Sequence, residues 1–380
     1  MKKTLSLILS LFLLILCLGV VACNNTNTTS HIHSAGNNEY AFDDNYHYQV
    51  CSICQQQINK EEHLFSPLKC KCGKKITYVN ENIYDRSENF IYLGSYPQTR
   101  VTEQALIDAL NSITDCEWQS YNYWLNGNKT DFMKYVDVTY ENQKYRGVVF
   151  ISYRPYWPTK EGIEDWTYQD DNGYLLGNVY WFKYEPIKWR ILSEKNGQAF
   201  LFCENIIDSQ EYDFDGASNS RYEPATIRGW LNNTFINTAF NNSEQNIILT
   251  TEVDNSERSS NPQNDPTFFR TGINDNASKN TFDKIFLLSL QELTNTEYGF
   301  DSEYNDFDLA RVKKASDYSR CQGVYDYNSE HLDCAAFYTR SAHYYDYEYA
   351  WTAFGKLFQR FENGVRMNSF GIVPALNIKL

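Results

Sequence analysis

Apolar and polar residues alternate along much of the chain beyond residue 89, as expected for strands with one buried face. In the segment YEPIKWRIL, Ile187, Trp189 and Ile191 alternate with charged residues, which predicts a half-buried strand. The segment YRGVVFISY is rich in β-branched and aromatic residues and predicts another strand. Three segments near the end of the chain, AAFYTRSA, YAWTAFG and SFGIVPALNIKL, extend the same pattern.

Helical spacing occurs in fewer segments. EQALIDALNSI carries apolar residues on one helical face, and Thr102 before it is a candidate N-cap. IRGWLNNTFINTAF has a similar face that includes Trp230, and FDLARVKKASDYSR predicts a further helix. Ser289 and Glu292 form the S-x-x-E pattern of a capping box. This mixture of strands and helices predicts a large α+β domain over residues 89–380.

The first 23 residues follow a different pattern. Lys2 and Lys3 precede the almost wholly apolar stretch Leu5–Val21, and a small residue then precedes Cys23. This arrangement resembles the signal of bacterial lipoproteins, in which the cysteine thiol receives a diacylglycerol and becomes the new N-terminus. An ordinary secretory peptide and an uncleaved anchor are the alternatives, but the stretch is short for a spanning helix. We expect residues 1–23 to be a lipoprotein signal peptide, with Cys23 holding the protein at the extracellular face of the cell membrane.

Residues 24–45 consist largely of Asn, Thr and Ser, with little that can be buried. This composition predicts a disordered polar tether that holds the rest of the protein away from the membrane. We expect His31 and His33 in this segment to be solvated, and metal ligation by them is the less favoured alternative.

Residues 46–80 contain two closely spaced cysteine pairs. Cys51 and Cys54 form C-x2-C, and Cys70 and Cys72 form C-x-C. Zinc takes four ligands in a closed structural site, and paired thiolates suit its tetrahedral geometry. Because the segment is too short to build a core, bound zinc would supply its folding free energy. We therefore expect a zinc module held by these four cysteines.

The second pair departs from the usual C-x2-C spacing, which leaves room for His47 or His63 to replace one thiolate. The order of histidines and cysteines is similar to that of small zinc-ribbon-like repeats on bacterial surface proteins. Two disulfides are the alternative, since an exported protein could form them. In either case we expect a structural role, because the protein itself fills all four positions.

Charge excludes one class of partner. The 380-residue chain has a net charge of −14, and an acidic chain repels phosphate backbones, so we expect no nucleic acid partner. Beyond the first segment, the sequence has no apolar stretch of 18 or more residues. Aromatic residues make up 16% of the chain, which is enough to fill a large core and leave tyrosines on the surface.

The usual catalytic motifs are missing from the sequence, which has no G-x-S-x-G, H-E-x-x-H, P-loop or G-x-G-x-x-G. Acidic residues cluster at Asp301, Glu303, Asp306 and Asp308. This cluster predicts a solvated loop, with weak calcium binding through its oxygens as the alternative.

A set of motifs carries a family resemblance. IYLGSYPQT, YEPIKWRIL, IRGWLNNTFINTAF, DKIFLLSLQE and GIVPALNIKL resemble an uncharacterised domain family of Gram-positive surface proteins and lipoproteins. The closing motifs of that family are usually W-x-L-R-S and G-V-R-P-A-L. Here Arg340 keeps the arginine of the first, whereas Val373 replaces that of the second, which puts a ligand role at this position in doubt. The resemblance spans Phe90–Leu380.

That family is in turn distantly similar to the C-type-lectin-like fold, as in the formylglycine-generating enzyme. The resemblance implies a twisted antiparallel sheet with a few helices. The chemistry of that enzyme does not carry over, because Cys321 and Cys334 are too far apart in sequence to match its copper-binding pair. The calcium motif of the lectins is also absent, since Glu223 and Pro224 are followed by Ala225.

These observations favour a lipid-anchored surface protein without enzymatic activity. We expect a binding module for an extracellular glycan or protein, because the exported, tyrosine-rich chain shows no catalytic set. Its candidate ligand-binding residues are Arg340, Tyr345, Tyr347 and Trp351, since aromatic rings suit sugars and peptides. The alternative is an extracellular hydrolase or modifying enzyme with two carboxylates in a surface cleft.

Overall fold

The computed structural model divides the chain into two compact units, Met1–Asn82 and Ile83–Leu380. It describes residues 32–35, 39–42, 46–62, 72, 83–125, 128–151, 173–213, 220–265, 277–324, 333–343, 349–358, 365 and 369–380, without the side chains of residues 62 and 122–132. Several predicted site residues lie outside these ranges, namely Cys23, His63, Cys70, Tyr345 and Tyr347.

The small unit contains a three-stranded antiparallel sheet. Its strands are β1 (Ala41–Phe42), β2 (Tyr46–Val50) and β3 (Gln57–Glu62), in the order β1-β2-β3. Ala35 forms a further antiparallel bridge with Cys51. The segment predicted to be a disordered tether therefore includes ordered residues.

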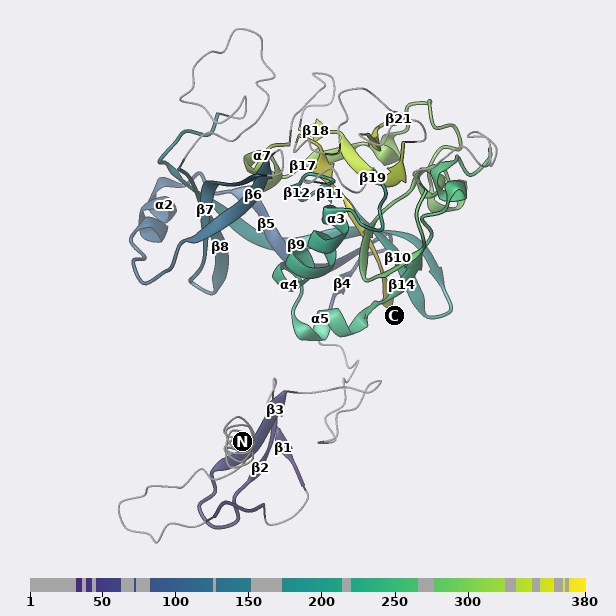
Figure 1. Ribbon diagram of the computed structural model, residues 1–380. Helices are drawn as coiled ribbons and strands as arrows, with labels where there is room; N and C mark the ends of the chain where they lie inside the picture. Colours follow the sequence, from purple (N-terminus) through teal and green to yellow (C-terminus); the bar gives the residue numbers. More distant parts are fainter. Residues whose placement is uncertain are drawn as a thin grey trace, which may run out of the picture. The chain divides into compact units, whose positions relative to one another are not determined.

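One sheet of ten strands forms the frame of the large unit (Figure 1). Its main path follows the order β13-β23-β10-β9-β8-β7-β6, with β5 also paired to β9. The strands are β4 (Asp85–Arg86), β5 (Phe90–Arg100), β6 (Gln119–Leu125), β7 (Asn128–Tyr140), β8 (Gln143–Phe150), β9 (Val179–Lys195), β10 (Gln198–Cys203), β13 (Ile248–Leu249), β16 (Ile285–Leu287) and β23 (Pro374–Lys379).

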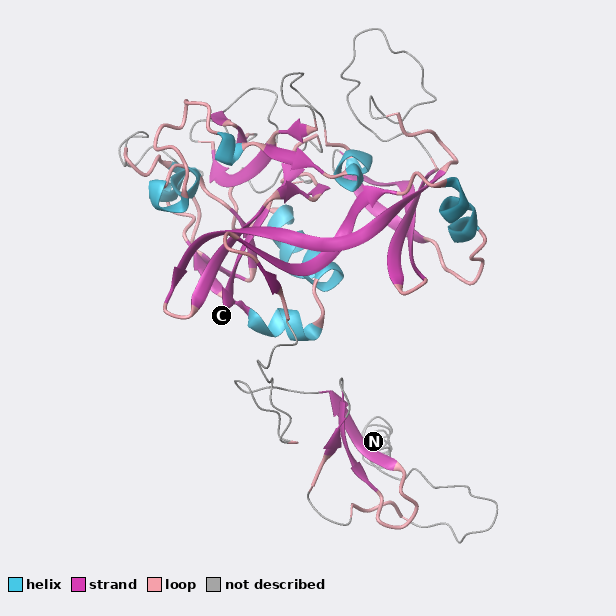
Figure 2. Ribbon diagram, turned by 180° about the vertical axis from the view of Figure 1, so that it is seen from behind, coloured by secondary structure: helices cyan, strands magenta, loops and turns pink. Residues whose placement is uncertain are grey.

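The longest strand, β9, joins the two halves of this sheet. It pairs with β8 in its first part and with β10 in its last part, while β5 runs along it (Figure 2). Ile187 and Trp189 are fully buried within it, so the predicted half-buried strand is confirmed. The Trp189 indole nitrogen donates to the Leu93 carbonyl at 2.9 Å, which satisfies its polar atom inside the core.

A second sheet of five strands contains three of the strands predicted near the end of the chain. Its order is β12-β22-β19-β20-β21, and its strands are β12 (Asp208–Ser209), β22 (Gly371–Ile372), β19 (Phe337–Ala342), β20 (Ala350–Phe354) and β21 (Lys356–Phe358). The rings of Phe202 in β10 and Phe337 in β19 lie 6.1 Å apart, so one core joins the two sheets.

Short strands form the remaining pairs. A small sheet has the order β11-β17-β18, and β14 pairs with β15. Their bounds are β11 (Asn205–Ile206), β14 (Thr251–Val253), β15 (Thr281–Asp283), β17 (Lys313–Ala315) and β18 (Cys334–Ala335). Only the pairs β11–β17 and β19–β22 are parallel among those described. The class is therefore mixed α+β and mostly antiparallel, as predicted.

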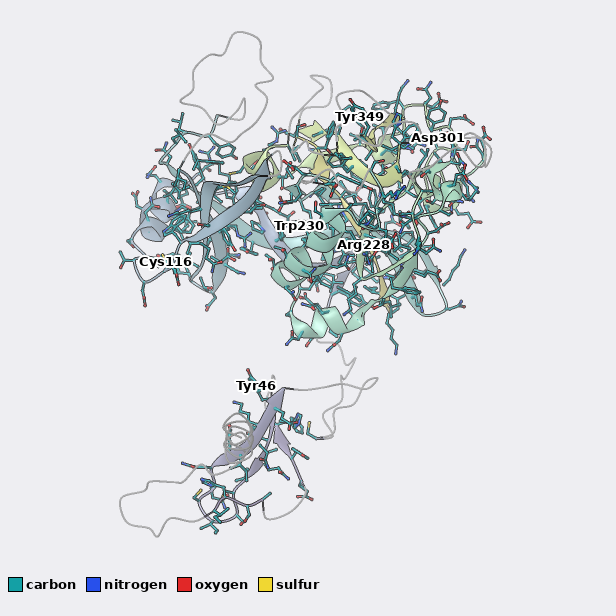
Figure 3. The ribbon with its side chains drawn as sticks, in the orientation of Figure 1. Tyr46, Cys116, Arg228, Trp230, Asp301 and Tyr349 are labelled. Atoms are coloured by element: carbon teal, nitrogen blue, oxygen red, sulfur yellow. The ribbon has the colours of Figure 1, made fainter. Side chains whose placement is uncertain are left out.

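The central helical segment packs against the large sheet. It consists of α3 (Thr226–Trp230), the π-helical turn η1 (Leu231–Phe235) and α4 (Ile236–Ala239), followed by α5 (Asn242–Ile247). The Phe235 ring lies 5.3 Å from that of Tyr96 in β5. Arg228 in α3 forms an ion pair of 2.8 Å with Asp283 in β15, and Trp230 lies close by on the same helix (Figure 3).

The other helices are short. They are α2 (Gln104–Asn111), η2 (Glu257–Ser260), α6 (Leu290–Leu293), η3 (Thr296–Tyr298), η4 (Leu309–Arg311) and α7 (Asp317–Gln322). The predicted capping box is confirmed, because the Ser289 hydroxyl accepts from the Glu292 amide while the Glu292 carboxylate accepts from the Ser289 amide. Among the described residues, no helix combines the length and apolar character needed to cross a membrane.

Two local predictions were wrong. Glu103 rather than Thr102 occupies the N-cap of α2, and its side chain makes no capping bond. The segment FDLARVKKASDYSR is not one helix but η4, β17 and α7 in succession. Ser316 follows β17 and caps α7, because its side chain accepts from the Ser319 amide.

Candidate functional site

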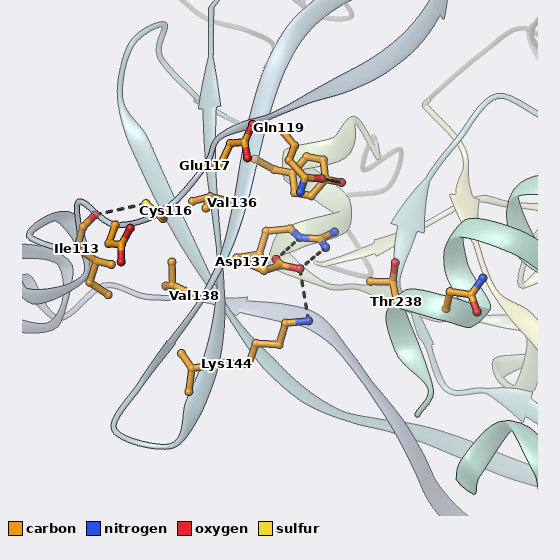
Figure 4. Close-up of a pocket in the computed structure, with 14 residues that line it drawn as sticks. Ile113, Cys116, Glu117, Gln119, Val136, Asp137, Val138, Lys144 and Thr238 are labelled. Carbon is orange, nitrogen blue, oxygen red and sulfur yellow. Dashed lines mark hydrogen bonds and ion pairs between the residues drawn. The ribbon is translucent and has the colours of Figure 1, made fainter. Parts of the chain in front are cut away.

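The main candidate site is a pocket of about 630 Å³ in the large unit (Figure 4). It lies where the connection between α2 and β6 meets strands β6, β7 and β8 and helix α4. It is lined by Ile113, Asp115, Cys116, Glu117, Gln119, Tyr135, Val136, Asp137, Val138, Thr139, Lys144, Arg146, Asn237 and Thr238. Most of these side chains are polar, and both signs of charge are present.

Two hydrogen bonds join an aspartate and an arginine that line the pocket. Asp137 in β7 and Arg146 in β8 are directly opposite each other in the sheet. The Arg146 Nε and Nη2 atoms donate to the two carboxylate oxygens of Asp137 at 2.8 Å each. Lys144 Nζ lies 3.4 Å from the same carboxylate, and the Tyr184 hydroxyl donates to it at 2.8 Å. The carboxylate is therefore held in one orientation.

These contacts set the protonation states of the pair. Burial disfavours ionisation of Asp137, but the hydrogen bonds and charge of Arg146 outweigh it, so the pKa of Asp137 lies below its ordinary value. Burial also disfavours the charge on Arg146, but Tyr318 and Asp137 outweigh it, and the pKa of Arg146 rises. Both groups stay charged at neutral pH, and Asp137 is unsuited to act as a proton donor.

Aromatic rings enclose the Arg146 guanidinium. Its central carbon lies 4.7 Å from the ring centre of Tyr135, 5.6 Å from that of Tyr184 and 5.7 Å from that of Tyr318. One of its nitrogens also donates to the Tyr318 hydroxyl at 3.2 Å. Cation–π contacts of this kind compensate the lost hydration of a buried guanidinium.

The walls of the pocket offer exposed polar groups. Asp115, Glu117 and Gln119 are exposed, and they come from the chain entering β6. The Tyr135 hydroxyl donates to the Gln119 side-chain oxygen at 2.9 Å, which fixes the amide against the ring. Thr238 on α4 donates to the Thr234 carbonyl within its own helix at 2.8 Å. The exposed acids and the amide are therefore the groups best placed to meet a ligand.

A partly buried chain of hydrogen-bonded side chains adjoins the pocket. The Tyr121 ring lies 6.1 Å from that of Tyr135, and the Tyr121 hydroxyl contacts the Gln210 amide nitrogen. Gln210 donates in turn to Asp208 at 3.1 Å, and the Tyr96 hydroxyl donates to the other Asp208 oxygen at 2.5 Å. Burial raises the pKa of Asp208 to about 6. Sequence analysis missed this chain, because its members are far apart in sequence.

The small unit contains a candidate metal group formed by His33, Cys51 and Cys54. One ligand atom from each residue lies within 4.8 Å of the others, and His33 Nδ1 is 3.5 Å from Cys54 Sγ. Imidazole and thiolate are ligands that zinc accepts. The group includes two predicted ligands, Cys51 and Cys54, together with a histidine that was expected to be solvated.

Other predicted metal ligands are placed differently. His47 is buried, packs edge-on against Tyr40, and lies 3.4 Å from the Glu61 carboxylate. Cys72 is partly buried and does not belong to the candidate group. Neither residue is brought together with Cys51 and Cys54 among the described residues.

Two of the predicted ligand-binding residues lie in the core instead. Arg340 is 4% exposed, and its guanidinium donates to the Leu287 carbonyl at 2.7 Å and to the Glu292 carboxylate at 3.0 Å. Trp351 is 3% exposed and lies in β20. Neither side chain lines the pocket. Arg340 uses its donors inside the protein, and the Trp351 ring packs edge-on against Tyr304 at 6.1 Å, which favours a structural role for both.

The acidic loop proposed for calcium is organised by Arg311. This arginine is fully buried and donates to the carbonyl oxygens of Asp301, Glu303 and Asp306. Its guanidinium also lies 3.5 Å from the Asp308 carboxylate. Calcium takes carbonyl and carboxylate oxygens as ligands, and the guanidinium already occupies the three carbonyls and lies beside one carboxylate of this loop. The arrangement therefore favours a loop closed by an internal cation.

Comparison of the chain with known proteins found a match to one family model. No curated protein and no solved structure matches the chain. The predicted resemblance to an uncharacterised family is supported over part of its predicted span. Residues 196–380 match the family described as "Domain of unknown function (DUF6273)".

Proposed function

We propose that the protein is a lipid-anchored extracellular binding protein whose large unit holds a glycan in the pocket between β6, β7, β8 and α4. The observation that carries this proposal is the polar lining of a concave site of about 630 Å³. Most small-molecule pockets are mainly apolar, with few polar groups. Here exposed acids, an amide and a lysine surround a tyrosine ring, which suits a ligand rich in hydroxyl groups.

The fixed groups at the base support recognition rather than catalysis. Asp137 is held by Arg146 and Tyr184, so its position does not depend on a ligand. A ligand would therefore meet a surface whose charge and shape are already set, which lowers the entropic cost of binding. Glu117 and Gln119 at the wall add an acceptor and an amide that can both accept and donate.

The alternative is a hydrolase that uses two carboxylates. Such an enzyme needs one carboxyl group that carries a proton and a second one about 5–9 Å away. Asp137 does not meet the first requirement, because Arg146 keeps its pKa low. The proposal therefore includes no enzymatic activity.

Two further expectations belong to this proposal. Lipidation of Cys23 would place the pocket outside the cell, where glycans and proteins of surfaces are the available ligands. The similarity of the large unit to the C-type-lectin-like fold remains an expectation from sequence. Most pocket residues precede the segment 196–380, so ligand choice would differ among proteins that share only that segment.

The test is a glycan array and a peptide array probed with the purified chain and matched variants. Glu117→Gln and Gln119→Ala change exposed pocket residues, while Glu88→Gln changes an exposed acid outside the pocket. We expect glycan binding that both pocket variants weaken and that the control retains. Glycan binding unchanged in both pocket variants, or binding to peptides alone, would contradict the proposal.

A further inference from the structure

The backbone closes the turn that carries Cys51 and Cys54. This turn connects β2 and β3, and the Gln55 amide donates to the Cys51 carbonyl at 3.0 Å. The Cys51 amide donates to the Gln56 carbonyl at 2.8 Å. Gln55 adopts the left-handed conformation with φ of 61°, which costs energy for a side chain of this type. The turn therefore holds the two cysteines together although one residue is strained.

A second backbone contact brings His33 to this turn. Ala35 pairs with Cys51 in an antiparallel bridge, and the Ser52 amide donates to the Ser34 carbonyl at 3.1 Å. Both contacts are made by the two residues that directly follow His33, so backbone pairing as well as its own side chain sets the position of its imidazole. His33 Nδ1 reaches Cys54 Sγ at 3.5 Å.

The spacing fits a tetrahedral zinc ion. With Zn–N near 2.05 Å and Zn–S near 2.3 Å, tetrahedral angles place a nitrogen and a sulfur ligand about 3.6 Å apart. The 3.5 Å between His33 Nδ1 and Cys54 Sγ agrees with this value. The same geometry places two thiolate sulfurs about 3.8 Å apart, which lies within the 4.8 Å limit of the group.

We propose that His33, Cys51 and Cys54 are three ligands of one zinc ion, and that this ion fastens the segment around His33 to the small unit. Two thiolates and an imidazole favour zinc over calcium or magnesium, which prefer oxygen ligands. The thiols release their protons to solvent as the metal binds. This site is independent of the glycan pocket.

The test uses the full chain, purified in detergent, reduced and freed of metal. Zinc affinity is measured by competition with a chromophoric chelator in the wild type, His33→Ala and the control His31→Ala. Removing a residue that only hydrogen-bonds to a metal ligand typically lowers metal affinity about 10–100-fold. We therefore expect His33→Ala, which removes a ligand itself, to lower zinc affinity roughly 100-fold or more. The control should bind as the wild type does. Equal affinities in all three proteins, or a larger loss in His31→Ala, would overturn the proposal.

X-ray absorption on the zinc-loaded wild type provides a readout that needs no variant to fold. The expected ligand shell contains at least one nitrogen together with sulfur. A shell of sulfur alone would exclude His33, and failure of the reduced wild type to bind zinc would exclude the site. Hydrogen exchange of residues 32–35 should slow when zinc binds, and this effect should be lost in His33→Ala.

Discussion

Asp137 and Arg146 face each other across β7 and β8 and share two hydrogen bonds of 2.8 Å at the base of the pocket. Because the guanidinium is buried and enclosed by tyrosines, the pair serves the fold of this edge of the sheet as well as the site. Removing one partner would leave a buried charge without compensation.

We therefore expect Arg146→Met to lower the free energy of unfolding by about 3–5 kcal/mol. The matched control is Arg86→Met, which removes the exposed ion pair of Arg86 with Glu194 and should cost less than about 1 kcal/mol. Urea unfolding followed by tryptophan fluorescence measures both. Equal losses in the two variants would mean that burial of the first pair has no energetic consequence.

Asp208 gives a prediction for pH. Burial raises its pKa from the ordinary 3.8 to about 6, so the folded protein holds a proton in this window that the unfolded chain has released. Protonated Asp208 contributes its full stabilisation below pH 3.8, the ordinary pKa that applies to the unfolded chain. This contribution is lost as pH rises through about 6, the pKa in the folded protein. A shift of about two pH units corresponds to about 3 kcal/mol.

The measurement compares unfolding of the wild type with that of Asp208→Asn across this window. The neutral amide cannot ionise, so the stability of the variant relative to the wild type should rise with pH by up to about 3 kcal/mol. A loss of hydrogen bonds in the variant adds an offset that does not depend on pH. A difference that stays flat from acid to neutral pH would show that Asp208 titrates normally.

Trp189 and Trp230 differ in burial, so replacing each with alanine should cost a different amount of stability. Trp189 is fully buried, and we expect Trp189→Ala to cost about 3–5 kcal/mol. Trp230 is only partly buried and stacks on Phe235 at 5.5 Å, so Trp230→Ala should cost about 1–2 kcal/mol. Thermal melts of the two variants give the order. A larger loss in Trp230→Ala would contradict the burial described for these residues.

Arg311 predicts how the acidic loop responds to metal. Arg311→Met removes the donors to the carbonyls of Leu293, Glu303 and Asp306, and we expect it to lower the free energy of unfolding by about 3 kcal/mol or more. Arg311→Lys keeps a cation and some donors, so its stability should lie between those of Arg311→Met and the wild type. Millimolar calcium should leave the melting temperature of the wild type unchanged. A clear rise with calcium would restore the loop as a binding site.

Cys23→Ala tests the proposed anchor. Without the thiol that receives the lipid, we expect the protein to leave the membrane fraction or to remain unprocessed. Metabolic labelling with a palmitate analogue should mark the wild type and not the variant. Equal labelling of both would show that Cys23 is not the lipidated residue.

Periodic and local signals made part of the fold predictable. The alternation around Trp189 identified a strand of the central sheet, and the spacing of Ser289 and Glu292 identified a helix start. The segment after Phe307 was mistaken for a helix, because the buried Arg311 looks like a surface residue in sequence. Ser316 followed by Asp317 was the available signal for the true helix start.

The candidate sites were harder to predict. Asp137 and Arg146 are close in sequence, but nothing in the pattern shows that a hairpin turns their pair toward a pocket. Tyr96 and Asp208 are far apart in sequence and meet only through the arrangement of strands. His33 was assigned to a tether by its polar neighbours, because a bridge such as Ala35–Cys51 leaves no periodic signal.

If Cys23 carries the proposed lipid, the Ala35–Cys51 bridge limits the length of chain between that lipid and the small unit. If the chain were unconstrained throughout residues 24–45, its extended reach would be roughly 75 Å. Because Ala35 is held by this bridge, the stretch from Cys23 to Ala35 can extend at most on the order of 40 Å. The small unit of a lipidated molecule would then explore a much smaller volume above the headgroups. Its effective concentration toward anything at the bilayer surface would rise accordingly.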